Sequence, residues 1–323
     1  MGGTRREFIG TCMAAGAMTV AKAAHGASGK PQPDARKPTW KSGLGLNGFM
    51  SSGHDFKKTY PIWEVLDFAS TEGFDGIELV EGWPMGGYPS PDEPGRIAAL
   101  KRLYGQYGLQ IYTIQTGGAA AYAADEAVRR GWLGTFADQV RLCTQLGCDF
   151  IGHWPGGGLA GNPDVDHAID CLASSYREAA AICADAGMYM SFEIEPPFVF
   201  NTLEHLQRIL AAVDHPACKT NYDPSHFDVM SGGNGTPEAM LAKLGVEHIG
   251  HVHLTDTDGT VFGGTSKHLP CGEGHCDIPA SLKMLRDGGY QGWVMIDGWK
   301  IEDVYRAARK GKQAIQAALQ PSA

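Results

Sequence analysis

Short apolar segments alternate with longer amphipathic segments eight times along this chain. The eight strand candidates are residues 43–49, 75–80, 109–116, 149–156, 188–196, 218–227, 249–256 and 292–297, and a segment with helical periodicity follows each of them. Strict alternation predicts parallel strands, because each helix carries the chain back to the start of the next strand. We therefore expect a single-domain α/β fold, a closed (β/α)8 TIM barrel over residues 43–320, with an open doubly wound sheet as the alternative.

The first residues differ in kind from the rest of the chain. Arg5 and Arg6 precede a weakly hydrophobic stretch, residues 9–21, and a run of small residues, 21–29. This order resembles a twin-arginine export signal, and an ordinary basic N-terminus is the alternative. We expect a signal peptide over residues 1–27 and a leader or linker over residues 28–42. The export machinery would then be one partner of the chain, and the protein would be periplasmic or secreted.

The charge balance argues against some classes of partner. The 323-residue chain has a formal net charge of −9, whereas nucleic acids and anionic membranes bind clustered Lys and Arg. Apolar runs stay well short of the roughly 20 residues that a membrane span needs. We therefore expect neither a nucleic-acid partner nor a stable membrane span.

The eight cysteines do not form a recognisable site. Cys12 lies in the expected signal, and no pair has the Cys-x-x-Cys spacing of a zinc or redox site. Cys271 and Cys276 share a loop, where they either form a disulfide, bind a metal, or remain neighbouring free thiols.

Ionisable side chains gather at the carboxyl ends of the strand candidates, where barrels of this kind carry their chemistry. In chain order these residues are His153 with Trp154, Glu193, Glu195, Asp223, His226, His251, His253, Asp256 and Asp297. For any one of them a structural role is an alternative to a functional one; Asp223, for example, precedes a proline and could simply start a turn. Together, unpaired ionisable groups in one barrel mouth would be costly to desolvate, and a bound divalent cation removes that cost. The pattern therefore predicts a metal centre.

These residues and their surroundings resemble the sugar isomerase and epimerase branch of the xylose isomerase-like barrels. The stretches that carry the resemblance are AGMYMSFEIEP (186–196), NYDPSHF (221–227), GHVHLTD (250–256), GEGHCDIP (272–279) and GGYQGWVMID (288–297). The resemblance implies a divalent cation, Mn²⁺, Mg²⁺ or Co²⁺ or else Zn²⁺, held by Glu193, Asp223, His253 and Asp297. Asp297 stands where the family usually has Glu, so direct ligation and ligation through water are both open.

The resemblance also implies a mechanism. A base removes a proton next to the carbonyl carbon of a metal-held sugar, and the resulting enediolate is protonated again. Glu193 would be the base, with Asp297 on the opposite face. The candidate substrate contacts are His226, Glu195, His153, Trp154 and His251, the last with a structural position below the metal as its alternative. Trp83, Phe198, Lys267 and Glu273 are weaker candidates, with core packing or a solvated loop as alternatives.

We therefore expect a metal-dependent isomerase or epimerase whose partner is a small carbohydrate, a free sugar or sugar derivative. A lyase or hydrolase on 3-keto-glycosides would use the same site. A phosphodiesterase of the endonuclease branch and a catalytically inactive sugar-binding barrel are further alternatives. A homo-oligomer is compatible with the sequence.

Overall fold

The computed structural model describes residues 39–82, 87–233 and 235–320. The expected signal peptide at residues 1–27 and most of the expected leader at 28–42 lie outside these residues, as does Trp83. The first strand begins at Lys41, slightly before the expected start of the barrel at residue 43.

Eight parallel strands close into a barrel in the order β1-β10-β7-β6-β5-β4-β3-β2. The barrel strands are β1 (Lys41–Gly45), β2 (Gly76–Val80), β3 (Gln110–Gly117), β4 (Phe150–Trp154), β5 (Tyr189–Phe192), β6 (Cys218–Tyr222), β7 (Ile249–Leu254) and β10 (Trp293–Ile296). The first strand pairs with both β10 and β2, which closes the ring and confirms the predicted (β/α)8 TIM barrel. The open doubly wound sheet is thereby excluded.

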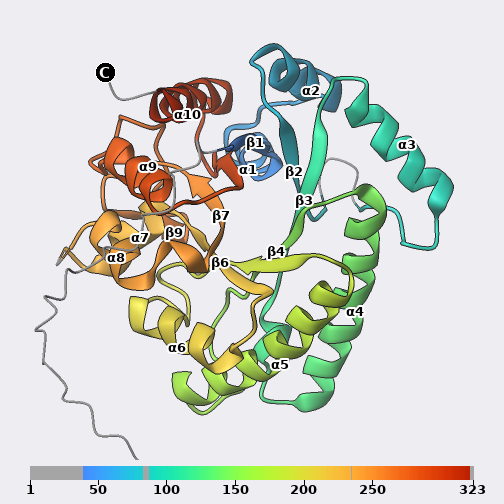
Figure 1. Ribbon diagram of the computed structural model, residues 1–323, viewed down its shortest axis with the longest axis vertical. Coiled ribbons are helices and arrows are strands. Elements are labelled where there is room, and N and C mark those ends of the chain that lie inside the picture. Colours follow the sequence, from blue (N-terminus) through green and yellow to red (C-terminus); the bar gives the residue numbers. More distant parts are fainter. Residues whose placement is uncertain (1–38, 83–86, 234, 321–323) are drawn as a thin grey trace, which may run out of the picture. The chain divides into compact units, whose positions relative to one another are not determined.

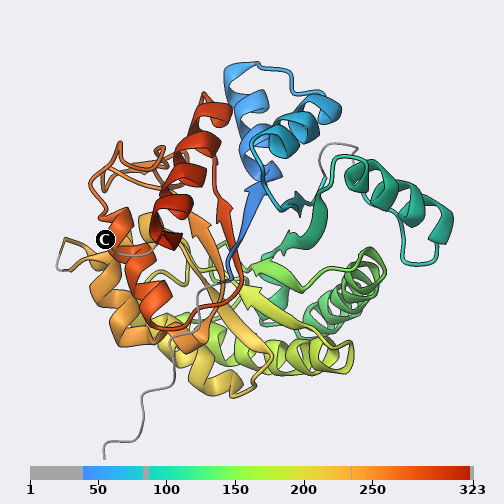
Figure 2. The same ribbon diagram turned by 45° about the horizontal axis from the view of Figure 1, so that its top comes forward.

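Helices surround the strands (Figures 1 and 2). They are α1 (Leu46–Phe56), α2 (Ile62–Thr71), α3 (Pro94–Gly105), α4 (Glu126–Leu146), α5 (Val165–Asp185), α6 (Leu203–Val213), α7 (Pro224–Ser231), α8 (Pro237–Leu244), α9 (Ile278–Asp287) and α10 (Val304–Leu319), with short 3₁₀ turns at Ala119–Tyr122 and Val246–His248. Side chains at several helix starts accept a hydrogen bond from the first turn, for example Asp125, Asp164 and Thr202. These caps satisfy backbone N–H groups that a helix leaves unpaired at its start.

Three elements depart from the sequence expectation. The predicted strand 43–49 ends at Gly45, and α1 begins at the next residue. Helix α7 occupies the end of the predicted strand 218–227, because Asp223 caps it and Pro224 at its first position fits a helix start. The long loop after β7 carries a small antiparallel hairpin of β8 (Val261–Phe262) and β9 (Thr265–Ser266).

Residues 43–48 read GLGLNG, the Gly-x-Gly-x-x-Gly spacing that often marks a dinucleotide-binding turn. In this barrel the last glycine of the motif, Gly48, is required by close packing. A Cβ added at Gly48 would lie 2.9 Å from Gly298 Cα, so only glycine allows α1 to approach the loop after β10.

Aromatic side chains fill the lower part of the barrel interior and leave the upper part to polar groups. Tyr112 stacks on Trp293 with ring centroids 3.8 Å apart, and Phe150 packs against the same pair. His251 lies on this layer, with its ring centroid 4.7 Å from that of Phe150. The apolar floor therefore supports a polar layer at the carboxyl ends of the strands.

The seven cysteines of the described residues are all free, which excludes the disulfide alternative for Cys271 and Cys276. The side chain of Cys276 faces α7, with its Sγ 3.9 Å from the carbonyl oxygen of Pro224, whereas Cys271 is buried within the loop. The two thiols therefore belong to separate packing environments.

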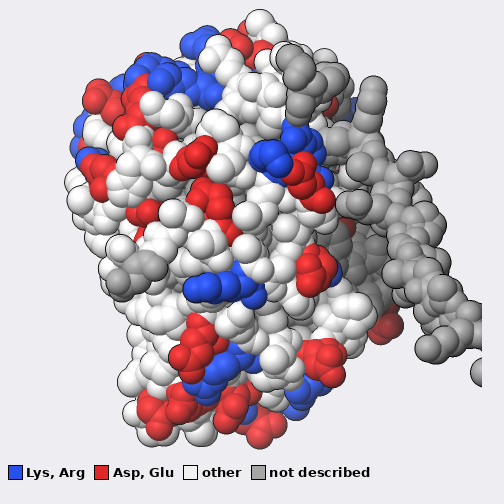
Figure 3. All heavy atoms as spheres, turned by 60° about the vertical axis from the view of Figure 1, so that its left-hand side comes forward, with Lys and Arg blue, Asp and Glu red and all other residues white. Residues whose placement is uncertain are grey.

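Two observations bear on the expectation of neither a nucleic-acid partner nor a membrane span. No helix within the described ranges combines the length and the apolar character that crossing a bilayer requires. On the face shown in Figure 3, Lys and Arg side chains are interspersed with Asp and Glu and form no continuous basic patch.

Candidate metal centre and active site

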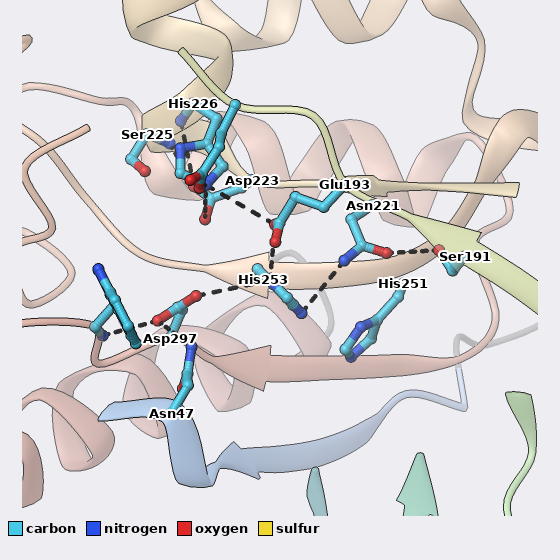
Figure 4. A network of polar contacts seen from close by, with 12 residues as sticks. Asn47, Ser191, Glu193, Asn221, Asp223, Ser225, His226, His251, His253 and Asp297 are labelled. Atoms are coloured by element: carbon cyan, nitrogen blue, oxygen red, sulfur yellow. Dashed lines mark hydrogen bonds and ion pairs between the residues drawn. The ribbon is translucent and has the colours of Figure 1, made fainter. Parts of the chain in front are cut away.

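Three residues from successive strand ends direct ligand atoms toward one point. Glu193 follows β5, Asp223 follows β6 and His253 lies in β7, and each offers one atom within 4.8 Å of the other two. All three side chains are buried. Figure 4 shows them converging from the neighbouring strands. The sequence prediction placed these three residues together, and the structure brings them together.

Asp223 has two functions in this geometry. Its Oδ1 accepts the backbone N–H of Ser225 at 2.7 Å and so caps α7, while its Oδ2 has no hydrogen-bond partner. The turn alternative and the ligand prediction are therefore compatible, because each uses a different oxygen of the same carboxylate.

His253 is held from below by groups that sequence reasoning did not identify. Its Nε2 lies 3.3 Å from Asn221 Nδ2 and 3.5 Å from Glu78 Oε2, which leaves Nδ1 for the centre. Glu78 is a buried acid in the middle of the apolar strand β2. The sequence feature that could have identified Glu78 is its place as a single acid in an otherwise apolar strand, because a buried carboxylate needs a polar or charged partner.

Asp297 lies beside His253, from the end of β10. Its Oδ2 is 3.6 Å from His253 Nδ1, and its Oδ1 accepts hydrogen bonds from Asn47 Nδ2 at 2.9 Å and from the backbone N–H of Trp299 at 2.8 Å. These bonds fix the orientation of the Asp297 carboxylate. Asn47 and Trp299 follow strand ends but are not ionisable, so the pattern of charged strand-end residues does not include them.

His226 bridges the centre and the opening of the barrel. Its Nε2 lies 2.9 Å from Glu195 Oε2, and its Nδ1 lies 2.7 Å from Ser266 Oγ in β9. Both ring nitrogens are thus engaged. The structure places His226 and Glu195 together at the mouth, where both line the cavity.

The pKa shifts reflect how crowded these charges are. Burial favours neutral His253, but the charges of Glu193 and Glu78 outweigh burial and raise the pKa of His253 well above its usual value. Burial likewise opposes the charge of His226, yet Asp223 and Glu195 raise the pKa of His226 to about 10. Burial raises the pKa of Asp223. Several buried carboxylates therefore lie close together, and their ionised forms need neighbouring positive charges to stabilise them.

A cavity of about 280 Å³ opens above these groups. Its acidic lining residues are Glu81, Glu193, Glu195 and Asp297, its histidines are His226, His253 and His268, and its aromatic wall is formed by Trp154, Phe198 and Trp299. The rings of Trp154 and Phe198 meet edge to face at 5.0 Å. Trp154 is therefore at the cavity, as expected, and Phe198 is its packing partner there.

Two predicted substrate contacts do not reach the cavity. His153 faces the outer helices, where its Nδ1 lies 2.7 Å from Tyr176 Oη and its ring packs on Trp132. His251 lies below the centre, with its Nδ1 3.5 Å from Glu78 Oε2. Side chains alternate along a strand, so His153 points outward although it precedes Trp154 directly. We therefore remove both residues from the candidate substrate contacts.

Three loop residues organise the rim instead of lining the cavity. The carboxylate of Asp256 accepts backbone hydrogen bonds within the loop after β7. Lys267 pairs with Asp258, and Glu273 pairs with Arg306 and Lys310. Lys267 and Glu273 are therefore engaged in ion pairs outside the cavity.

The buried position of His153 leads to a pH prediction. Burial lowers the pKa of His153 from 6.5 to about 3. Below about pH 6.5 the imidazole of His153 is therefore protonated in the unfolded chain but stays neutral in the folded chain. The free energy of unfolding consequently decreases as the pH is lowered. Between pH 7 and pH 5 the wild type should lose about 2 kcal/mol more unfolding free energy than His153→Gln, as measured by urea denaturation. Parallel losses in the two proteins would contradict the buried neutral state.

The donor set fits a divalent cation. Glu193 Oε1, Asp223 Oδ2 and His253 Nδ1 are buried and make no hydrogen bond, although Glu193 Oε1 lies only 2.8 Å from His253 Nδ1. Orphaned buried polar atoms are costly, and a metal ion would satisfy all three at once. Two carboxylate oxygens with one imidazole suit Mn²⁺, Co²⁺ or Zn²⁺ in particular.

Curated proteins include relatives of this chain. Inosose dehydratase of Clostridium botulinum (strain Alaska E43 / Type E3) is 26% identical over 162 residues, which cover 45% of this chain and 53% of that protein. The chain thus spans about half the length of that curated relative.

Two solved structures share the fold. The IOLI protein with a bound zinc atom superposes with a TM-score of 0.68 at 16% identity, covering 86% of this chain and 96% of that one. The 3-keto-D-glucoside 4-epimerase YcjR from E. coli gives a TM-score of 0.65 at 20% identity, covering 86% and 99%. A family model described as xylose isomerase-like TIM barrel matches residues 66–318. The chain belongs to the xylose isomerase-like TIM barrel family.

Proposed function

We propose that this protein is a divalent-metal-dependent isomerase or epimerase that moves a proton on an uncharged sugar. The observation that carries the proposal is the set of three orphaned ligand atoms, on Glu193, Asp223 and His253, at the base of the cavity. When bound there, the cation would polarise substrate oxygens and stabilise negative charge that develops on them.

Two carboxylates are placed to move the proton. Glu193 and Asp297 lie on either side of His253 (Figure 4). Glu193 would take a proton from the substrate carbon, and Asp297, oriented by Asn47 and the backbone of Trp299, would face the same carbon from the other side. Return of the proton to the neighbouring carbon gives isomerisation, and return to the same carbon from the opposite face gives epimerisation.

The pair of His226 and Glu195 would bind the substrate at the mouth. His226 Nε2 lies 2.9 Å from Glu195 Oε2 and holds this carboxylate in place, so the other oxygen of Glu195 can accept a hydrogen bond from a sugar hydroxyl. The edges of Trp154 and Phe198 offer an apolar face to the sugar ring.

The cavity also indicates the class of sugar. Among the described residues that line it, none is Lys or Arg, whereas four are Asp or Glu. A phosphate or carboxylate group would therefore find no Lys or Arg to pair with among these residues, and an uncharged sugar fits the lining better. At about 280 Å³ the cavity is small for a ligand site, which suits a single sugar unit.

Export fits an uncharged substrate. We include in the proposal the twin-arginine export expected from Arg5 and Arg6, and a periplasmic or secreted location. Phosphorylated sugars are mainly cytoplasmic, so an exported enzyme would meet free sugars or their oxidised derivatives.

A lyase acting on 3-keto-glycosides is the second candidate. The similarity to an inosose dehydratase favours it. Proton removal by Glu193 next to a ketone can lead to loss of the group on the neighbouring carbon. Both candidates therefore begin with the same proton transfer and differ in the second step, which is either reprotonation or elimination.

An exchange experiment tests the proposal and separates the candidates. The metal-loaded protein is incubated in D₂O with uncharged aldoses, ketoses and 3-keto-glycosides and with matched phosphate esters, and a chelated sample is the control. Deuterium at a carbon beside the carbonyl, with the molecule intact, supports isomerase or epimerase activity, and a released group supports the lyase. We expect phosphate esters to react with a kcat/KM at least about 100-fold lower. Equal or better turnover of the esters would contradict the assigned substrate class.

A further inference from the structure

His268 is a buried histidine whose ring nitrogens make no hydrogen bond. It lies in the loop after β7, lines the cavity, and its side chain is only 2% exposed. A buried imidazole with neither Nδ1 nor Nε2 hydrogen-bonded is costly unless something at the site satisfies it.

The loop fixes this ring in place from both sides. Two residues before it, Ser266 Oγ bonds to His226 and to Ser225 Oγ at 2.7 and 2.8 Å. One residue after it, Leu269 forms a backbone bridge with Asp256 through hydrogen bonds of 3.0 and 2.8 Å. The position of His268 is therefore built by the fold and is not a chance excursion of an exposed loop.

His268 approaches the metal centre from the side of Asp223. One ring nitrogen of His268, one of His226 and one oxygen of Asp223 lie within 4.8 Å of one another. His226 already engages both of its nitrogens, with Glu195 and Ser266, so it has no nitrogen left for a cation. Both ring nitrogens of His268 are free of hydrogen bonds, and Asp223, whose Oδ2 is also free of them, belongs to the group with Glu193 and His253 as well.

Asp297 is placed to orient this histidine. The Asp297 Oδ1 atom lies 3.5 Å from His268 Nδ1. A carboxylate near one imidazole nitrogen fixes the tautomer and directs the other nitrogen to a metal. The carboxylate at this strand end is one methylene shorter than Glu and is held back by Asn47 and the backbone of Trp299.

We propose that His268 is a ligand of the cation, completing the set of Glu193, Asp223 and His253, and that Asp297 acts on it as a positioning residue as well as facing the substrate. The centre would then contain two imidazoles and two carboxylates. This inference rests on the proposed metal centre but goes beyond it, because it assigns the fourth ligand to a loop residue.

Cu²⁺ and Co²⁺ test the assignment without any substrate. Pulsed EPR of the Cu²⁺-loaded chain counts coordinated imidazoles, and calorimetry with Co²⁺ gives affinity. We expect two imidazoles in the wild type and one in each of His268→Gln and His253→Gln, with Co²⁺ affinity at least about 10-fold weaker in both variants. His248→Gln, outside the cavity and in none of the groups of metal-ligating side chains among the described residues, is the control and should keep two imidazoles and full affinity. Unfolding curves of the metal-free proteins would confirm that all variants fold.

The outcomes separate this inference from the proposed function. If His268→Gln keeps the imidazole count and the affinity of the wild type while Asp223→Asn loses metal, the centre stands and the role of His268 is refuted. If the wild type binds neither ion, both proposals fail. One imidazole fewer in His268→Gln supports the assignment.

Discussion

Replacing Glu193 by Gln should lower turnover of any accepted sugar by about 10²–10⁴-fold, the usual contribution of a positioned general base. Gln keeps the shape and one oxygen at the centre, but it cannot accept the proton. The rate of deuterium incorporation from D₂O measures this step directly. Metal content of the variant is measured in parallel, so that loss of the base is distinguished from loss of the ion.

Glu195→Gln is the matched control for this prediction. The two carboxylates are two residues apart, but Glu195 contacts His226 at the mouth and not the ligand atom of His253. We expect its replacement to raise KM and to leave kcat within about 10-fold, because it affects binding of ground state and transition state alike. Full activity of metal-loaded Glu193→Gln would mean that another group is the base.

Asp256→Ala should cause the largest loss of stability among the polar substitutions considered, about 3–5 kcal/mol, because several buried donors that each cost about 1–3 kcal/mol when unpaired lose their acceptor. The buried carboxylate of Asp256 accepts four backbone N–H groups: those of Thr257 and Cys276 at 2.8 and 3.1 Å, and those of Gly272 and Gly274 at 2.9 and 3.0 Å. Removing it leaves these donors unpaired inside the loop. Gly274 shows how tight the arrangement is, since a Cβ there would lie 2.3 Å from Asp256 Oδ1.

Asp258→Ala provides the comparison within the same loop. Asp258 is partly exposed and pairs with Lys267, so its loss should cost at most about 1 kcal/mol. Urea denaturation of the two variants measures the difference. The Asp256 variant should also bind Co²⁺ less tightly, because the loop that it organises carries His268. Similar stabilities in the two variants would show that the network around Asp256 contributes little.

The sequence was sufficient for the barrel. Strand–helix alternation determines the topology, and topology brings the ionisable strand ends together at one mouth. The choice of Glu193, Asp223 and His253 among the ionisable residues there followed from the family resemblance, and the structure places these three side chains close together. The substrate contacts that were predicted wrongly have a physical explanation. His153 and Trp154 are neighbours in sequence, but side chains alternate along β4, so only Trp154 lies at the cavity.

The parts that sequence reasoning missed depend on packing between distant segments. Glu78 lies in a strand that reads as apolar, and its role is visible only once β2 is beside His253. His268 lies in a loop whose path is determined by the hydrogen bonds of Asp256 and Ser266. Helix α7 is short, and its start coincides with the strand end that supplies Asp223. Periodicity carries no information about such contacts.

The metal content of the purified protein tests the central claim most directly. Asp223→Asn keeps an acceptor for the cap of α7 but removes the charge that the centre needs, so folding is preserved while ligation is weakened. We predict about one divalent ion per wild-type chain and little or none in Asp223→Asn after the same purification. A wild-type protein that neither carries nor takes up a divalent ion, or an Asp223→Asn protein that retains the wild-type content, would contradict the account.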